Sequence, residues 1–316
     1  MFSLKGKTAL ITGSGRGIGL AIAEAMAQQG ADIFLSDING AVVDRAAADL
    51  GARFPKVTVR GLILDVTDKA QIDKAMQTIA EAGKGLQILV NNAGINLREP
   101  VADMDDAVWQ RMLDTNLTSV FRVSRAAFPM LKERGGKVIN LCSLMSEIAR
   151  PTVSPYASTK GAVRQFTRAL ATEWAEHGIQ VNGIAPGFIA TDMNIPLMQD
   201  KELNDYIMRH TPAKRWGKPS EVASVAAFLA SPAADFVNGQ VIFIDGGFID
   251  TLRFFHPEPH LYTWWSFRAN ARANNKGWRI DYAMASEAVR PMLRGARILP
   301  DVRHSDHCPM LLEIDF

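Results

Sequence analysis

The sequence predicts an α/β fold built on a doubly wound parallel sheet, followed by an appended C-terminal fragment. Short apolar runs of strand length alternate with stretches of helical apolar spacing, which favours a parallel sheet covered by helices on both faces. A glycine-rich turn joins the first predicted strand to the first predicted helix. The composition changes after residue 250, so we expect one domain over 1–250 and a separate fragment over 251–316.

The first half of the chain supplies alternating strands and helices. Gly30 ends the first helix, and Asp37 stands directly after the second strand. The predicted elements are, in order, a strand at 7–12, a helix at 18–26, a strand at 32–36, a strand that ends at 64–65, a helix after it, and a strand at 86–90.

The second half continues the alternation around one long helix that reaches His177. Ser154 suits the N-cap of this helix, Pro155 its first position, and Gly178 its stop. The stretch 188–215 is polar and has no clear period, so we expect a mobile lid there. The other predicted elements are a helix around 116–131, a strand at 137–141, a strand around Val181, a helix at 220–229 and a strand at 240–244.

The glycine-rich turn has the spacing Gly13-x3-Gly17-x-Gly19. Glycines between a strand and a helix let the backbone approach a pyrophosphate, which then lies at the positive helix N-terminus. The turn therefore predicts a dinucleotide cofactor. Its candidate contact residues are Gly13, Ser14, Arg16, Gly17, Ile18 and Gly19.

Two charged residues bear on which dinucleotide is bound. Asp37, at the end of the second strand, is placed to accept hydrogen bonds from a ribose diol, and its charge repels a 2′-phosphate. Arg16 favours NADP instead, because a guanidinium in the turn could reach such a phosphate. We favour NAD and keep NADP as the alternative.

A tyrosine and a lysine four residues apart predict the chemistry. Tyr156 and Lys160 share one face of the long helix, so an ammonium stands beside a phenol and favours its ionised form. A phenol tuned in this way can exchange a proton with an alcohol near neutral pH. Ser143 lies thirteen residues before Tyr156, at the end of an apolar strand.

Residues 1–250 resemble the short-chain dehydrogenase/reductase family, which implies a Rossmann fold and an NAD(P)-dependent oxidoreductase. By this resemblance Tyr156 is the acid/base, Ser143 positions the reacting oxygen, Lys160 tunes the tyrosine and binds the nicotinamide ribose, and Asn116 holds a water of the proton relay. The motifs that carry the resemblance are Thr12–Gly19, Asn91–Gly94, Asn116, Ser143, Tyr156-x3-Lys160, Pro186–Gly187 and Asp245–Gly247. Further cofactor contacts that it implies are Asp65, Val66, Asn92, Ala93, Gly94, Tyr156, Lys160, Pro186, Gly187 and Thr191.

Within this family the chain is similar to gluconate 5-dehydrogenases and related sugar-acid dehydrogenases. The similarity lies in 142–150, 173–174, 211–217 and 236–240. It implies interconversion of D-gluconate and 5-keto-D-gluconate, and the 3-oxoacyl-thioester reductases of the same family are the competing interpretation. The candidate substrate contacts, two cations for a carboxylate and two groups for polyol hydroxyls, are Arg98, Arg150, Ser146 and Glu147.

Residues 261–316 resemble the C-terminal end of the exonuclease III and apurinic endonuclease family. The matching pieces are 262–267, 270–272, 277–282 and 305–309. The resemblance implies that Asp281 orients His307 and that Asp306 assists a metal site. Because the metal ligands that this family needs upstream are missing, we expect an inert fragment produced by fusion or frameshift, with no bound metal. A metal-dependent nuclease remains the alternative of another class.

Composition narrows the partners and the location. The formal charge of +2 is too small to indicate nucleic-acid binding, and no apolar run has the length of a membrane span. Two cysteines without metal spacing, and no apolar segment at the N-terminus, indicate a reducing compartment, the cytoplasm. The family resemblance implies a homo-oligomer, a tetramer or a dimer, acting on a small-molecule substrate. A non-catalytic dinucleotide sensor is a third class of function.

Overall fold

The computed structural model describes residues 1–247, 249–250, 284–285, 292–299 and 310–315. The chain divides into two compact units. The first consists of Met1–Pro196 and Gly217–Asp245, and the second of Leu197–Trp216 and Gly246–Phe316.

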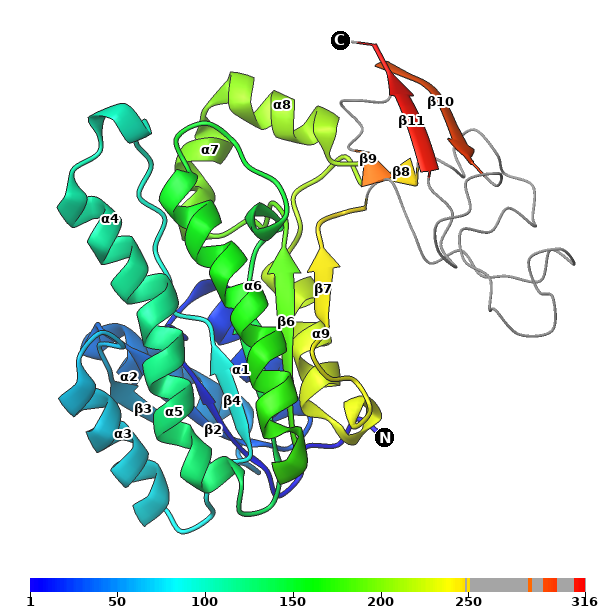
Figure 1. The fold of residues 1–316 in the computed structure, drawn as a ribbon. Coiled ribbons are helices and arrows are strands. Elements are labelled where there is room, and N and C mark those ends of the chain that lie inside the picture. Colours follow the sequence, from blue (N-terminus) through cyan, green and yellow to red (C-terminus); the bar gives the residue numbers. More distant parts are fainter. Residues whose placement is uncertain (248, 251–283, 286–291, 300–309, 316) are drawn as a thin grey trace, which may run out of the picture. The chain divides into compact units, whose positions relative to one another are not determined.

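The first unit is organised by one seven-stranded sheet in the order β3-β2-β1-β4-β5-β6-β7 (Figure 1). Every neighbouring pair in it is parallel, which confirms the predicted doubly wound parallel sheet. All carboxyl ends therefore lie at one edge. The strands are β1 Thr8–Ile11, β2 Asp32–Asp37, β3 Val59–Ile63, β4 Ile88–Asn91, β5 Gly136–Leu141, β6 Ile179–Pro186 and β7 Val241–Ile244.

Helices cover both faces of the sheet. One hydrophobic cluster joins α1, α2 and α9 to the strands, and another joins α3, α5 and α6 to them. The sequence analysis did not identify α2, whose apolar residues are largely alanine, or α4, which is short. The helices are α1 Gly17–Gln28, α2 Gly40–Arg53, α3 Lys69–Glu81, α4 Asp106–Leu113, α5 Ser119–Leu131, α6 Ser154–Trp174 and α9 Pro219–Ala230.

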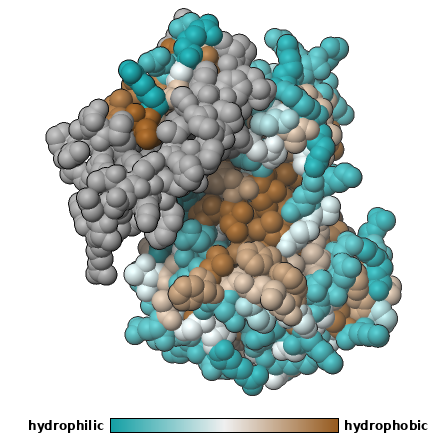
Figure 2. Space-filling model, turned by 90° about the vertical axis from the view of Figure 1, so that its right-hand side faces the viewer, coloured by the Kyte–Doolittle hydropathy of each residue, from teal (hydrophilic) through white to brown (hydrophobic). Residues whose placement is uncertain are grey.

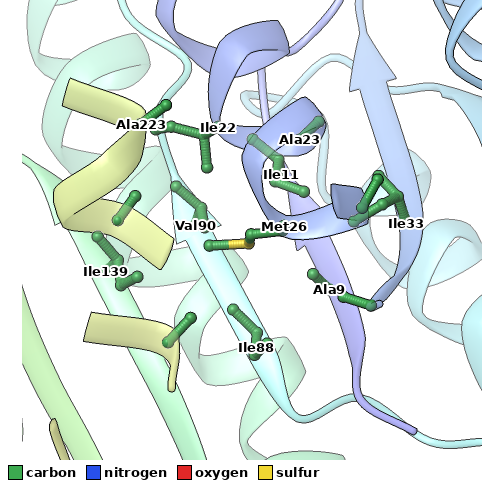
Figure 3. Packing of buried hydrophobic residues seen from close by; sticks show 14 of the residues in the cluster. Ala9, Ile11, Ile22, Ala23, Met26, Ile33, Ile88, Val90, Ile139 and Ala223 are labelled. Atoms are coloured by element: carbon green, nitrogen blue, oxygen red, sulfur yellow. The ribbon is translucent and has the colours of Figure 1, made fainter. Parts of the chain in front are cut away.

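Near-complete burial of the central strands explains their apolar sequences. Every residue of β1, β4 and β5 is buried, as expected for parallel strands between two helical layers. Ile22 and Met26 of α1 pack toward Ile11, Ile88 and Val90 (Figure 3). Full burial of such side chains stabilises the fold by about 1.5–3 kcal/mol each.

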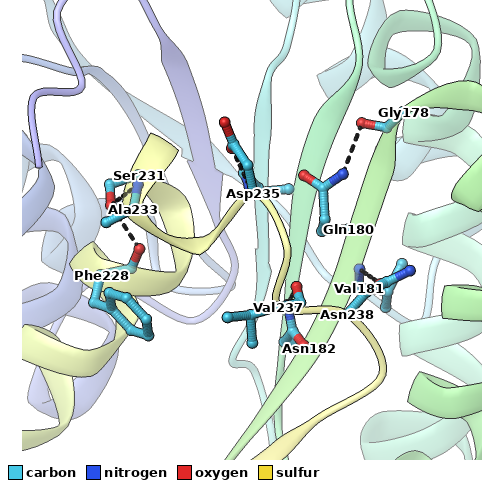
Figure 4. A network of polar contacts seen from close by, with 11 residues as sticks. Gly178, Gln180, Val181, Asn182, Phe228, Ser231, Ala233, Asp235, Val237 and Asn238 are labelled. Carbon is cyan, nitrogen blue, oxygen red and sulfur yellow. Dashed lines mark hydrogen bonds and ion pairs between the residues drawn. The ribbon is translucent and has the colours of Figure 1, made fainter. Parts of the chain in front are cut away.

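Two asparagines hold the loop that leads into β7 against β6 (Figure 4). Asn182 donates to the Val237 carbonyl at 2.7 Å and accepts from the Gln240 amide at 3.0 Å. Asn238 accepts from the Val181 amide at 2.8 Å and donates to the Ala171 carbonyl at 3.0 Å. These bonds satisfy buried backbone groups and set the register of the last strand.

The edge strand β7 carries an apolar surface. Its four residues are all apolar and half-buried, and among the described strands only β6 pairs with it. Figure 2 shows hydrophobic side chains on the side of the molecule where β7 lies. The nearby Phe236 is fully exposed. In the described residues, no helix has the length and apolar character needed to cross a bilayer.

The long helix differs from its prediction at its first residue. α6 begins at Ser154, and the Val153 carbonyl before it accepts the Ala157 amide at 2.8 Å, so Val153 and not Ser154 is the N-cap. Pro155 is therefore the second helical residue, not the first as predicted, but it still lies in the first turn. The helix ends at Trp174, continues as a 3-10 turn, and Gly178 stops it in the left-handed region at φ +68°.

The region 188–215, expected as a lid without regular structure, contains short helices. They are the 3-10 turn η5 Asp192–Asn194, α7 Ile195–Gln199 and α8 Lys201–His210. Asp200 caps α8 by accepting the Leu203 amide at 3.0 Å. The mobility of this region stays a prediction.

The second unit includes two short antiparallel strand pairs. β8 Ile249–Asp250 pairs with β9 Met284–Ala285, and β10 Leu293–Ile298 pairs with β11 Met310–Ile314. The segments that resemble the nuclease family, with Asp281, Asp306 and His307, lie outside the described residues. That resemblance and the boundary at residue 250 therefore stay predictions.

Candidate active site

The predicted site residues gather at the carboxyl edge of the sheet because they follow its central strands. The glycine-rich turn follows β1, Asn91–Gly94 closes β4, Ser143 follows β5, and Pro186–Gly187 closes β6. In open parallel sheets, this edge is where ligands bind.

Close backbone packing explains two glycines of the turn. A Cβ on Gly13, whose φ is +60°, would lie 2.8 Å from the Ala93 Cα, and one on Gly19 would lie 2.5 Å from the Asn92 Nδ2. That Nδ2 donates to the carbonyls of Thr12 and Gly13, both at 2.8 Å. Asn92 thus fastens the turn to β4 and holds its backbone in place for a ligand.

The N-terminus of α1 suits a pyrophosphate. α1 starts at Gly17, and the N-cap residue Arg16 makes no side-chain hydrogen bond to the first turn. The Arg16 side chain therefore leaves the amides of the first helical turn uncapped, and the helix dipole favours an anion at this N-terminus. The Ser14 hydroxyl makes its hydrogen bonds within the protein: it donates to Ile11 O at 2.8 Å and accepts from the Ser36 amide at 3.0 Å. Direct contact of Ser14 with a cofactor stays a prediction.

Two acidic residues at the ends of β2 and β3 are held by backbone donors. Asp37 accepts the Gly15 amide on Oδ2 at 3.3 Å and the Asn39 amide on Oδ1 at 3.1 Å. Asp65 accepts both the amide and the hydroxyl of Thr67 on Oδ1, at 2.8 and 2.7 Å. Both carboxylates are thereby fixed next to the predicted adenosine side of the site. Val66, beside Asp65, is buried.

Asn116 lies in a π-helical turn, Asp114–Thr118, between α4 and α5. Its Oδ1 accepts the Ile95 amide and its Nδ2 donates to the Ile95 carbonyl, both at 2.8 Å. The same Nδ2 lies 3.4 Å from the Thr159 hydroxyl, which donates to the Tyr156 carbonyl at 2.9 Å. The widened turn, a feature often found at functional sites, links the loop after β4 to α6.

The Lys160 ammonium lies beside Tyr156, the predicted acid/base. The side chain is 5% exposed, and Nζ lies 5.7 Å from the centroid of the Tyr156 ring. Nζ donates to the Leu141 carbonyl at 2.5 Å, and a Cβ on Gly94 would be 3.8 Å from it. The ammonium therefore lies among the ends of β4, β5 and α6, beside the Tyr156 ring.

Ser143 follows β5 and begins the 3-10 turn η3 Leu144–Ser146, which packs against α6. Its Oγ accepts the Met145 amide at 3.1 Å, which leaves the hydroxyl proton for another acceptor. Burial raises the pKa of the adjacent Cys142 thiol to about 11, so this thiol is not a nucleophile at neutral pH.

Arg98, a substrate candidate in the loop after β4, interacts electrostatically with Tyr156. Partial burial lowers the pKa of its guanidinium below the ordinary value, and charge interaction with Tyr156 opposes that shift. The adjacent Glu99 amide donates to the Thr152 carbonyl at 3.1 Å. Thr152 has a φ of +68°, which is strained for a β-branched residue, so the loop before α6 is held in an unusual conformation beside this site.

The other three substrate candidates have partners within the protein. Ser146 donates its hydroxyl to the Ser143 carbonyl, and Glu147 forms an ion pair with Arg164 of α6. Arg150 stacks over the Phe188 ring, with its guanidinium carbon 5.0 Å from the ring centroid. Their contact with a substrate stays a prediction.

Asn96 is a candidate that the sequence analysis did not single out. Its Oδ1 is buried and has no hydrogen-bond partner in the described part of the chain. Such an atom needs an explanation, and a substrate hydroxyl provides one. Its place two residues before Arg98 is the signal that could have identified it.

The segment after β6 closes the site. The Gly187 amide donates to the Ile244 carbonyl at 2.8 Å, and a Cβ on Gly187 would lie 2.7 Å from the Asp245 Cα. Thr191 faces the glycine-rich turn, since a Cβ on Gly17 would lie 3.9 Å from its Cγ2. In the residues that the structure describes, no three His, Cys, Asp or Glu side chains group as metal ligands would.

Comparisons with known proteins agree with this geometry. The profile of a family described as Enoyl-(Acyl carrier protein) reductase matches residues 13–249. The chain is 42% identical over 248 residues to the gluconate 5-dehydrogenase of Gluconobacter oxydans, which aligns 78% of this chain and 96% of that protein. It is 42% identical over 250 residues to the 5-keto-D-gluconate 5-reductase of Escherichia coli, with 79% and 98% aligned.

Solved structures of related enzymes are also similar to this chain. A gluconate 5-dehydrogenase from Burkholderia cenocepacia in complex with NADP and tartrate is similar with a TM-score of 0.73 and 44% identity, over 78% of this chain and 96% of that one. A 3-oxoacyl-[acyl-carrier protein] reductase from Brucella melitensis has a TM-score of 0.73 and 36% identity, over 78% and 92%.

Proposed function

The chain belongs to the short-chain dehydrogenase/reductase family, and on this premise we propose that it interconverts D-gluconate and 5-keto-D-gluconate. As an oxidoreductase of this family it uses a nicotinamide dinucleotide. The observation that carries the choice of substrate is the 42% identity to a gluconate 5-dehydrogenase and to a 5-keto-D-gluconate 5-reductase, aligned over 96% and 98% of their lengths. A sugar acid needs a cation for its carboxylate close to the group that exchanges the hydroxyl proton.

The residues divide the chemistry between them. A nicotinamide dinucleotide held at the glycine-rich turn would supply or accept the hydride. Tyr156 holds or releases the proton of the substrate oxygen, and the ammonium of Lys160 stabilises the phenolate form. Ser143 donates its free hydroxyl proton to the same substrate oxygen, and Asn116 holds the loop after β4 against α6.

The substrate proposal assigns two groups beyond Tyr156. Arg98 pairs with the carboxylate, and the buried Oδ1 of Asn96 accepts a hydrogen bond from a substrate hydroxyl. A 3-oxoacyl-thioester reductase is the second candidate function, supported by the family description and by the Brucella melitensis relative. Such a substrate has no carboxylate near its keto group and gives Arg98 no partner.

For the cofactor, we propose that both dinucleotides bind and that NAD is preferred. Asp37 supports this, because two backbone amides hold its negative charge where a 2′-phosphate would have to approach. The NADP named with the Burkholderia cenocepacia relative and the presence of Arg16 support use of NADP as well.

The test is a reduction and oxidation screen with both dinucleotides. We expect turnover of D-gluconate and of 5-keto-D-gluconate, and slower turnover of neutral polyols that lack a carboxylate. Turnover of a 3-oxoacyl thioester in preference to the sugar acids would transfer the assignment to the second candidate. Dinucleotide binding without turnover of either class would favour a sensor.

We also propose that the protein is a homo-oligomer and that it is cytoplasmic. The half-buried apolar edge strand β7 and the exposed Phe236 support a homo-oligomer, which light scattering of the full chain measures. The buried free thiol of Cys142 is consistent with the reducing cytoplasm.

A further inference from the structure

One ion pair connects the glycine-rich turn to the segment after β6. Arg16 Nη1 lies 3.5 Å from Asp192 Oδ2, and both side chains are more than half exposed. Arg16 is the N-cap residue of α1, and Asp192 begins the 3-10 turn η5. β4 and β5 lie between β1 and β6 in the sheet, so the ends of β1 and β6 are three strand spacings apart, about 14 Å. The ion pair joins the segments that follow these two strands.

The predicted ribose end of the site adjoins the same part of the turn. Asp37 marks it, because its Oδ2 accepts the Gly15 amide and a Cβ on Gly15 would lie 2.9 Å from that oxygen. Arg16 is the next residue and carries the guanidinium of the turn. A guanidinium is the side chain best suited to a phosphate, so its position decides whether a 2′-phosphate beside Asp37 finds a partner.

We propose that Asp192 is a specificity-determining residue that disfavours NADP by holding the guanidinium of Arg16 on the η5 side of the turn. In this arrangement Asp37 faces the ribose without a neighbouring cation, which suits the diol of NAD. NADP binds when its 2′-phosphate draws Arg16 away from Asp192, and breaking that ion pair weakens its binding. The inference rests on the proposed use of NAD and NADP and concerns their ratio, not the substrate.

The experiment measures dissociation constants of NADH and NADPH by nicotinamide fluorescence, without substrate, on the full chain. An exposed ion pair is weak, so we expect Asp192→Asn to tighten NADPH relative to NADH by about two- to fivefold. Arg16→Gln alone should weaken NADPH more than NADH. Added salt should shrink the effect of Asp192→Asn, because the ion pair is exposed.

Two controls separate the proposed device from a general effect of charge. Asp49→Asn removes the same charge from an exposed pair with Arg45 on α2, at 3.9 Å, and should leave the NADPH/NADH ratio unchanged. In an Arg16→Gln background, Asp192→Asn should no longer change the ratio. A change that persists there, or an unchanged ratio in Asp192→Asn alone, would overturn the proposal. Absence of binding of either dinucleotide would refute the proposed function itself and this inference with it.

Discussion

Lys160 and Tyr156 show how a single pair of residues acquires a chemical role from its surroundings. The lysine is buried among strand ends, its ammonium is anchored by the Leu141 carbonyl, and it faces the tyrosine ring. The Leu141 carbonyl thus holds the ammonium beside the ring, which a solvated helix face would not do.

Removing the phenol oxygen should stop the reaction and leave cofactor binding intact. Tyr156→Phe keeps the ring beside Lys160 but has no proton to exchange, so we expect a loss of about 10² to 10⁴ in kcat. Steady-state kinetics gives the loss, and NADH fluorescence titration gives the binding. Turnover near that of the wild type would contradict the role assigned to Tyr156.

Replacing the cation beside Tyr156 should affect acidic substrates selectively. Arg98→Ala removes the proposed partner of the carboxylate, and we expect kcat/KM for D-gluconate to fall about 10- to 100-fold. A neutral polyol substrate should lose little, because it offers the guanidinium no charge. Arg125→Ala is the matched comparison, since Arg125 lies over the Phe121 ring on α5, outside the candidate site. Equal losses on acidic and neutral substrates would show that Arg98 acts on structure and not on the carboxylate.

At the scale of elements, the turn between β1 and α1 depends on the packing of its backbone against β4. Gly13 and Gly19 have no room for a side chain, and Asn92 bonds to the turn. The tight packing leaves no room for a Cβ at these glycines. It also leaves the N-terminus of α1 open to a ligand.

Adding one methyl group to this turn should abolish cofactor binding. Gly13→Ala places a Cβ 2.8 Å from the Ala93 Cα at a φ of +60°, so the turn must move. We expect a loss of roughly 1–3 kcal/mol in the free energy of unfolding, together with a loss of NADH affinity. Urea unfolding and fluorescence titration measure the two effects.

Gly83→Ala is the matched control for that substitution. Gly83 also has a positive φ, +78°, but its Cβ would meet nothing within 4 Å. It should therefore lose about 1 kcal/mol of stability from backbone strain and keep its NADH affinity. If both variants lost affinity equally, strain in glycine turns and not contact with Ala93 would be the cause.

At the scale of the whole molecule, the described parallel sheet and its hydrophobic clusters lie before residue 250. The three buried hydrophobic clusters consist of residues up to Ile244, and the seven strands of the sheet end there as well. The family match ends at residue 249, and the aligned part accounts for 96–98% of the relatives from Gluconobacter oxydans and Escherichia coli.

Deleting the residues after Asp250 should leave the enzyme active. We expect the shortened chain to fold cooperatively and to keep the kcat/KM of the full chain for D-gluconate, because among the described residues none of the three hydrophobic clusters loses a member. Kinetics and urea unfolding of both forms provide the measurement. Loss of activity in the shortened form would show that the last residues contribute to the site, and abasic-site DNA cleavage that depends on His307 would revive the nuclease alternative.

The sequence alone determined the parallel sheet, the cofactor turn and the Tyr156–Lys160 pair, because each depends on local spacing or on the period of a single element. It placed the N-cap of α6 one residue late and did not identify α2, whose apolar residues are largely alanine, or α4, which is short. Only the tertiary structure decided that Arg98 lies near Tyr156, that Glu147 pairs with Arg164, and that Arg16 pairs with Asp192. These partners come from different strand ends and loops, and it is the order of strands in the sheet, which no local pattern encodes, that brings them together.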